Sequence, residues 1–163
     1  MAELTTLETK LGEVLGLAMA AQDSTQKVKK LAQEEGNDEL VHQLERIHQE
    51  AAETEERCTE VAEGLDGKKT AVLEKAREVK REAGEMMSTY LGDDADALDG
   101  FEFLTMAEAG ELGHWEIVRE MSRTTGEDAA LELADWAIPI QRRHTELVRD
   151  SALELAAEEA VGA

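Results

Sequence analysis

Five polar residues able to bind a metal ion or to hydrogen-bond strongly lie near the middles of four stretches with helical periodicity. Several of them lie on or beside the apolar stripe that should face a core. Helical bundles build carboxylate-bridged metal sites by projecting Glu and His side chains inward from each helix at one level. The spacing Glu-x-x-His occurs at 45–48 and 111–114, which adds to this pattern. The sequence therefore raises the hypothesis of a metal site at the level of Gln22, Glu50, Glu111, His114 and His144.

The candidate metal ligands favour one ion over two. A di-iron centre needs hard anionic oxygen ligands that hold and bridge two cations, with imidazoles completing the coordination. An amide in place of a bridging carboxylate removes a negative charge and leaves two iron ions poorly neutralised. We therefore expect at most a single divalent ion, iron, manganese or zinc. The residues that could hold it are Glu50, Glu53, Glu111, His114, Glu116 and His144, with Gln22 as a weak neutral ligand.

The same residues also have a purely structural interpretation, in which no cofactor is bound. In a chain with 38 acidic residues, Glu-x-x-His arises often by chance, and Glu45 with His48 fits a solvated helix flank. His114 and His144 can be core histidines hydrogen-bonded to Glu111, to Gln22 or to each other, in a polar layer that fixes helix register. The sequence leaves both interpretations open.

Composition favours a single all-α domain over residues 1–163. A chain of 163 residues fits one domain with a real core. Aromatic residues make up only 3% of the chain and there is one proline, while Ala, Glu and Leu dominate, a balance that favours helices over strands. Cys58 is the only cysteine, so no intramolecular disulfide can form, and we expect it to fill the core as a small apolar residue.

The charge narrows the possible partners. The 38 acidic and 17 basic residues give a net charge of −21, which repels phosphate backbones and anionic lipid surfaces, so we expect neither nucleic acid nor membrane as a partner. The excess of acidic residues either attracts cations and basic proteins or forms a solvated surface, which suits solubility or a cell interior of high salt concentration. No signal peptide or apolar run long enough to cross a bilayer is visible, which favours a cytoplasmic location.

The polar residues are positioned by four predicted main helices. The third of these helices is expected to bury Leu104, Ala107, Glu111, His114, Val118 and Met121. Trp115 in the third helix and Trp136 in the fourth are expected at helix faces, where their indole N–H groups reach water or a carbonyl. Pro139 lies inside the fourth and predicts a kink or a break. The predicted bounds are about 5–35, 38–64, 96–124 and 127–158, and the residues Thr5 to Glu8 form a capping box at the first helix.

An additional helix is predicted between the second and third main helices. The segment 64–96 is too long for a tight turn, and about 70–90 itself has helical periodicity. A crossover helix makes the second and third main helices parallel, whereas short connections make the other neighbours antiparallel. The sequence therefore predicts a ferritin-like up-down four-helix bundle with a long crossover connection that contains an additional helix.

The order of elements and the local sequence resemble the YciE/YciF-type ferritin-like family over about residues 7–155. The stretch His114-Trp115-Glu116-Ile117 is similar to the family's Glu-His-Tyr-Glu-Ile, and Gly67-Lys68-Lys69-Thr70 resembles the start of its crossover. The resemblance implies a ferritin-like bundle, often a homodimer, whose prototypes are ferroxidase-like and stress-associated. It therefore implies at most a ferroxidase-like oxidoreductase.

Aligned with that family, this chain retains few of the expected ligands. The family's carboxylates on the first, third and fourth helices fall at Gln22, at Gly113 and near Pro139, whereas Glu50, with Glu53 one turn on, matches on the second. The resemblance thus implies a relative that has lost or moved most of its ligand set. We expect a stress-associated protein that binds iron or another divalent metal in its core, or else a metal-free bundle with a vestigial site that serves as a structural or protein-interaction module.

Overall fold

The structure, a computed structural model, describes residues 2–162 and contains helices but no strand in that range. The all-α prediction is confirmed. The C-terminal helix continues past its predicted end at residue 158, and the other helix ends lie within one residue of their predicted positions. The five helices are α1 (Thr6–Glu34), α2 (Asp38–Glu63), α3 (Lys69–Tyr90), α4 (Ala97–Thr125) and α5 (Asp128–Gly162).

Capping residues fix where the long helices begin and end. At the start of α1, the Glu8 amide donates to Thr5 Oγ1 at 3.2 Å and the Thr5 amide donates to Glu8 Oε2 at 2.7 Å, which is the predicted capping box. Asp96 and Asp99 form the same reciprocal arrangement at the start of α4. Gly126 ends α4 with a φ of 74°, a left-handed conformation that glycine adopts without a steric penalty.

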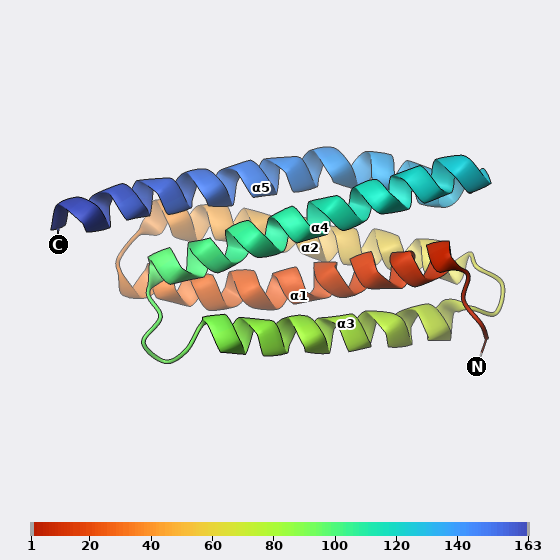
Figure 1. The fold of residues 1–163 in the computed structure, drawn as a ribbon, viewed down its shortest axis with the longest axis horizontal. Coiled ribbons are helices and arrows are strands. Elements are labelled where there is room, and N and C mark those ends of the chain that lie inside the picture. The colour runs from red at the N-terminus through yellow and green to blue at the C-terminus, as the bar shows by residue number, and fades with distance from the viewer. Residues whose placement is uncertain (1, 163) are drawn as a thin grey trace.

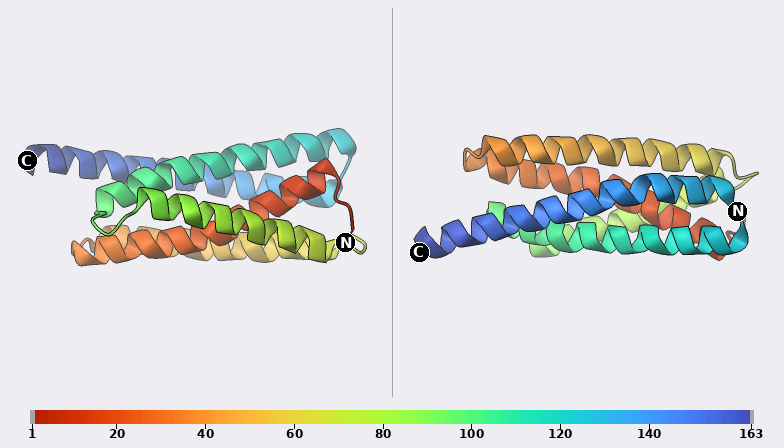
Figure 2. Two further views of the ribbon diagram at one scale, coloured as in Figure 1. Left: turned by 60° about the horizontal axis from the view of Figure 1, so that its bottom comes forward. Right: turned by 90° about the horizontal axis from the view of Figure 1, so that it is seen from above.

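The helices form a bundle in which each runs opposite to the one before it in the chain (Figure 1). Consequently α2 and α4 run in the same direction, as a crossover connection requires. Helix α1 packs against α2, α3 and α4, helix α4 packs against α5, and α2 also contacts α5. Because α3 makes few contacts with any helix except α1, it lies on the outside of the group formed by the other four helices (Figure 2).

Helix α5 passes through Pro139 without a break. Of the two outcomes predicted for Pro139, a break does not occur, whereas the bend of α5 in the right-hand view of Figure 2 agrees with a kink. A proline inside a helix costs about 3 kcal/mol because one backbone hydrogen bond is lost. Side chains buried on both sides of it, Ala137, Ile138 and Gln141, anchor the helix against its neighbours and offset that loss.

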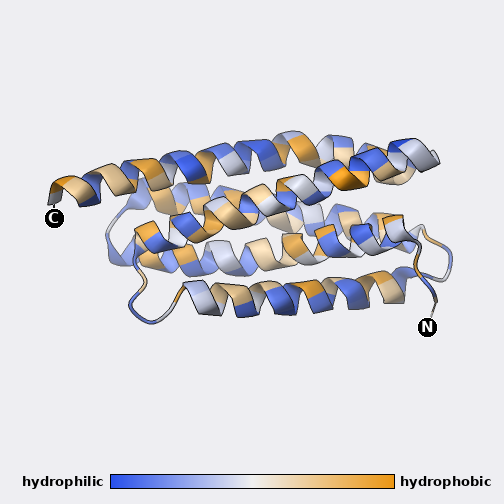
Figure 3. Cartoon of the chain, in the orientation of Figure 1, coloured by the Kyte–Doolittle hydropathy of each residue, from blue (hydrophilic) through white to orange (hydrophobic). Residues whose placement is uncertain are grey.

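Two apolar clusters form the core, and polar residues separate them. The first gathers residues from the beginnings of α1 and α5 and the ends of α2 and α4, and the second gathers residues from the opposite ends of those helices. The colouring by hydropathy shows apolar and polar segments following one another along the helices (Figure 3). Large members include Leu15, Trp115 and Ile138 in the first cluster and Leu44, Phe101 and Leu104 in the second.

A glycine allows α1 and α3 to approach closely, and its replacement gives a test of this packing. A Cβ at Gly16 would lie 2.5 Å from the carbonyl oxygen of Ala76 and 2.8 Å from Cβ of Val79. We expect Gly16→Ala to lower the free energy of unfolding by about 1–3 kcal/mol, because α3 must shift away. Urea denaturation measures this change.

The matched control for this prediction is Gly113→Ala on α4. A Cβ at Gly113 meets no atom within 4 Å. This substitution should raise the free energy of unfolding by about 0.5–1 kcal/mol, because alanine favours the helical backbone more than glycine does. The close packing of α1 on α3 would be disproved if the two substitutions had the same effect.

Candidate functional site

Four polar side chains from α4 and α5 lie in the interior between the two apolar clusters. The exposed fractions are 2% for Glu108, 4% for Glu111, 5% for Gln141 and 3% for His144. Glu50 of α2 joins them with 18% of its side chain exposed. Buried groups of this kind are costly unless they are hydrogen-bonded or paired, so their partners determine what the cluster can do. We call these five residues the interior polar cluster.

Glu50 is bound by cations of the chain itself. Arg143 donates a hydrogen bond to Glu50 Oε2, and His144 Nε2 lies 3.3 Å from Glu50 Oε1. Arg46, one turn away on α2, places Nε 3.3 Å from the same Oε1. Burial alone would raise the pKa of Glu50, but the hydrogen bonds from Arg143 and His144 outweigh it and hold the pKa below its ordinary value. Glu50 is therefore an ionised carboxylate that already has its counter-charges.

Glu108 is held by the side chains of α5. The Gln141 amide donates both to a carboxylate oxygen of Glu108 and, at 3.0 Å, to its backbone carbonyl. His144 Nδ1 lies 3.8 Å from Glu108 Oε2. The imidazole of His144 thus lies between two carboxylates, with Nε2 toward Glu50 and Nδ1 toward Glu108. A ring in this position links α2, α4 and α5 electrostatically.

Glu111 differs from the other two acids because no cation lies against it. Burial raises its pKa well above the ordinary value, and the negative charge of Glu108 one turn away adds to that rise. The indole of Trp115 acts in the opposite direction, but its N–H is buried and makes no hydrogen bond of acceptable geometry. Within residues 2–162, no carbonyl oxygen accepts from this N–H, whereas the sequence suggests water or a carbonyl as its partner. Glu111 thus combines a raised pKa with a carboxyl group that no lysine or arginine within residues 2–162 contacts.

The cysteine beneath Glu111 is part of the core. Cys58 is free and fully buried, as its place on the apolar stripe of α2 predicted. Burial raises the pKa of its thiol, and the nearby carboxyl groups of Glu111 and Glu55, when ionised, raise it further. The thiol is therefore a packing group and not a nucleophile.

Of the seven predicted ligands, the structure brings Glu50 and His144 into contact. A third, Glu111, lies one turn from Glu108, whose carboxylate is 3.8 Å from His144. His114 has 41% of its side chain exposed and bonds through Nδ1 to the carbonyl oxygen of Gly110 at 2.8 Å. The other three predicted ligands are engaged outside the cluster. Glu53 pairs with Arg57, Glu116 lies 3.9 Å from Arg142, and Gln22 donates to Glu55.

Two members of the interior polar cluster, Glu108 and Gln141, were not recognised in the sequence. Each lies three residues before a residue that was recognised, Glu111 and His144 respectively. The spacing i, i+3 places such pairs on one helix face, and this signal could have identified them. Within residues 2–162, no three His, Cys, Asp or Glu side chains are arranged to hold a metal ion.

The donor set does not fit a two-metal centre. Such a centre needs several free carboxylates to neutralise and bridge two cations. Here the guanidinium groups of Arg143 and Arg46 bind Glu50, and the amide of Gln141 binds Glu108. Only one imidazole, that of His144, lies among the carboxylates. Two metal ions would add their charges to those of the cations that already neutralise Glu50.

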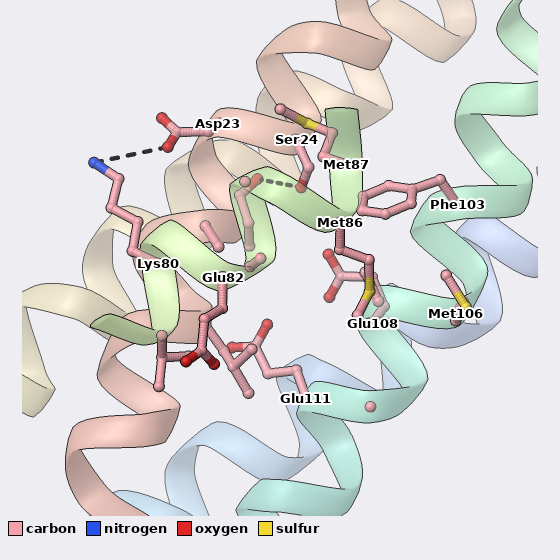
Figure 4. A pocket seen from close by; sticks show the side chains of 18 of the residues that line it. Asp23, Ser24, Lys80, Glu82, Met86, Met87, Phe103, Met106, Glu108 and Glu111 are labelled. Carbon is pink, nitrogen blue, oxygen red and sulfur yellow. Dashed lines mark hydrogen bonds and ion pairs between the residues drawn. The ribbon is translucent and has the colours of Figure 1, made fainter. Parts of the chain in front are cut away.

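A groove of about 390 Å³ leads from the surface to the two buried acids of α4. It lies between α1, α3 and α4, where α3 and α4 diverge. Figure 4 shows Glu108 and Glu111 extending from α4 into this space, with Met86, Met106 and Phe103 near the former. The interior polar cluster is therefore reached through a mostly apolar passage.

Comparisons with known proteins give no assignment for this chain. No protein-family model, curated protein or solved structure matches it. None of the helices in residues 2–162 has the length and apolar character needed to cross a membrane. A functional conclusion therefore rests on the geometry of the interior polar cluster and of the groove.

Proposed function

We propose that this chain is a ferritin-like helical bundle that acts as a metal-independent binding module. One observation carries this proposal: Glu50, a central member of the predicted ligand set, is paired with the guanidinium groups of Arg143 and Arg46 and lies against the imidazole of His144. In this proposal, the interior polar cluster joins the helices and forms the polar end of the groove. It does not oxidise iron.

The ferritin-like part of the proposal rests on topology and on the family resemblance. Helices α1, α2, α4 and α5 surround the interior polar cluster, and α3 connects α2 to α4 so that these two run in parallel. This is the connectivity of bundles with one long crossover. The homodimer and the association with stress that the resemblance implies remain predictions.

The metal-independent part of the proposal follows from charge. An arginine next to a carboxylate supplies a permanent positive charge, because guanidinium does not lose its proton in proteins. A divalent ion at Glu50 would have to displace Arg143 or lie beside it, and like charges in a partly buried site repel strongly. The chain therefore stabilises its buried acids without metal.

A second candidate function is the binding of a single divalent ion between α2 and α5. Glu50 Oε1 and His144 Nε2 lie 3.3 Å apart, a separation that two ligands of one ion can adopt. Glu108 faces the other nitrogen of the ring, so a third protein ligand would have to come from a rearranged side chain. This candidate makes a different prediction about stability.

Thermal unfolding with chelator and with added Fe(II), Mn(II) or Zn(II) separates the two candidates. We expect the same midpoint in every condition. An ion that binds only the folded chain at a hundred times its dissociation constant would add about 2.7 kcal/mol, which corresponds to a rise of about 5–11 °C for a domain of this size. A rise of this size that His144→Gln abolishes would refute the metal-independent proposal.

A further inference from the structure

We propose that the groove between α1, α3 and α4 binds a small amphiphilic cation, a primary ammonium group attached to an apolar chain or ring. The ammonium group would lie against Glu111 and Glu108, and the apolar part would lie along α3. This inference names the ligand of the proposed binding module and therefore rests on it.

Within residues 2–162, no lysine or arginine contacts the acids at the polar end of the groove. Glu111 lines the groove with 4% of its surface exposed. The indole of Trp115 lies beside its carboxyl group without a hydrogen bond of acceptable geometry, and no ion pair within residues 2–162 reaches it. Its neighbour Glu108 receives the amide of Gln141 but makes no contact with a lysine or arginine. An ammonium group has three donors and no acceptor, which matches two carboxyl groups that point the same way.

The raised pKa of Glu111 is consistent with this assignment. The carboxyl group keeps its proton because a second negative charge next to Glu108 would be buried without a counter-charge. An entering ammonium group would supply that counter-charge and replace the proton. The groove would then hold a buried, hydrogen-bonded ion pair, in which each partner lowers the cost of burying the other.

The walls of the groove suit an apolar chain or ring. They are formed by small or flexible side chains that leave space along the helices, Ala20, Ala83, Met86, Met87, Met106 and Ala107. Methionine side chains adapt to ligands of varied shape. The volume of about 390 Å³ lies in the range of about 300–1,000 Å³ that small-molecule sites occupy. A hydrated metal ion would leave most of this apolar surface unused.

Charge distinguishes the ammonium compound from other occupants. Four acidic side chains line the groove, Asp23, Glu82, Glu108 and Glu111, against Lys80 and His114. Lys80 already lies 3.7 Å from Asp23. A fatty acid would place its carboxylate among these acids, and a second copy of this chain would bring a further net charge of −21. The acidic side chains at the polar end favour a cation, and the walls favour an apolar group. An ammonium compound with an apolar part provides both.

The test is a titration of the full chain with octylammonium chloride, followed by calorimetry and by the fluorescence of Trp115. Trp115 is fully buried one turn from Glu111, and Trp136→Phe leaves it as the only tryptophan. We expect saturable binding of one ion per chain, with and without chelator. Octanoate and 1-octanol should bind at least about tenfold more weakly, because neither supplies a positive charge.

Two variants and a matched control locate the binding. Gly84 lines the groove, and a Cβ there meets no atom within 4 Å, so Gly84→Leu should fill the groove without displacing the helices. We expect Gly84→Leu and Glu111→Gln each to weaken octylammonium binding by about tenfold or more. Gly113→Leu has equally free space but lies outside the groove, and it should bind within about twofold of the unmodified chain.

Several results would overturn this inference. They are the absence of saturable binding, equal binding of octanoate, and unchanged binding by both Gly84→Leu and Glu111→Gln. A dimer in sedimentation that Gly84→Leu dissociates would also overturn it, because the groove would then be an interface between copies. If octylammonium does not bind and chelator leaves the thermal midpoint unchanged, the inference about the ligand fails but the metal-independent proposal stands. Binding that chelator abolishes would refute the metal-independent proposal as well.

Discussion

His144→Ala should lower the free energy of unfolding by about 3–5 kcal/mol, because it leaves two buried carboxylates without their shared partner. The ring lies between Glu50 and Glu108, at 3.3 Å and 3.8 Å, and is 3% exposed. Its removal also leaves a cavity. For a domain of this size the loss corresponds to about 6–20 °C in the thermal midpoint. Circular dichroism during thermal and urea unfolding measures both quantities.

Two further variants show whether charge causes this loss. His114→Ala removes a largely exposed histidine from α4 and should change the free energy of unfolding by less than about 0.5 kcal/mol. Adding Glu108→Gln to His144→Ala removes one of the uncompensated carboxylates, so it should recover part of the lost stability. A loss below about 1 kcal/mol for His144→Ala would show that the ring does not pair with these carboxylates.

Glu111→Gln should stabilise the chain at pH 8, and the gain should disappear toward pH 4. A carboxyl group whose pKa is raised on folding binds its proton more tightly in the folded state, so stability falls as pH rises above the unfolded pKa. For Glu111 that fall begins near its ordinary value of 4.5. We expect a gain of about 1–3 kcal/mol at pH 8, the usual cost of a buried polar group without a partner. Urea denaturation as a function of pH measures it.

Glu50→Gln should change the free energy of unfolding in the opposite direction. Folding lowers the pKa of Glu50, so its ionised form contributes stability above pH 4.5 that is lost as pH falls through the folded pKa. Glu50→Gln should therefore destabilise the chain at pH 8. Glu116→Gln, an exposed acid on α4, should show little change at either pH. A destabilised Glu111→Gln at pH 8 would show that Glu111 is ionised and paired in the folded chain.

Local sequence features determine most of the fold. The apolar period and the capping residues Thr5 and Asp96 are sufficient to give five helices with nearly the observed limits. Gly126 and the short connections around it predict antiparallel neighbours. The sequence around Pro139 does not show whether the helix breaks there. The packing of Ile138 and Gln141 on other helices offsets the missing hydrogen bond.

The face of α4 shows why the site was predicted only in part. The sequence predicts that Glu111, His114 and Val118 share the buried stripe, with Trp115 beside it, and adjacent residues differ by about 100° around a helix. The structure buries Trp115 fully and turns His114 outward. The larger apolar surface of the indole favours this rotation. The same rotation places Glu108 in the core.

The groove could not be predicted from periodicity at all. It depends on the divergence of α3 from α4, which is set by close packing of α3 on α1 at Gly16. A helical pattern shows which residues share a face but not how far two helices stand apart. The apolar residues on α3, such as Met86 and Val79, indicate a buried face in the sequence, yet Met86 is 52% exposed at the groove.

Metal analysis of the full chain tests the central claim most directly. The protein should be purified without chelator from cells supplied with iron, manganese and zinc, beside His144→Gln as a matched control. Because Arg143 and Arg46 already supply positive charge to Glu50, we predict far less than one ion per chain in both proteins. One or more ions per chain, lost in His144→Gln, would contradict the claim that the interior polar cluster is stabilised by the chain's own cations.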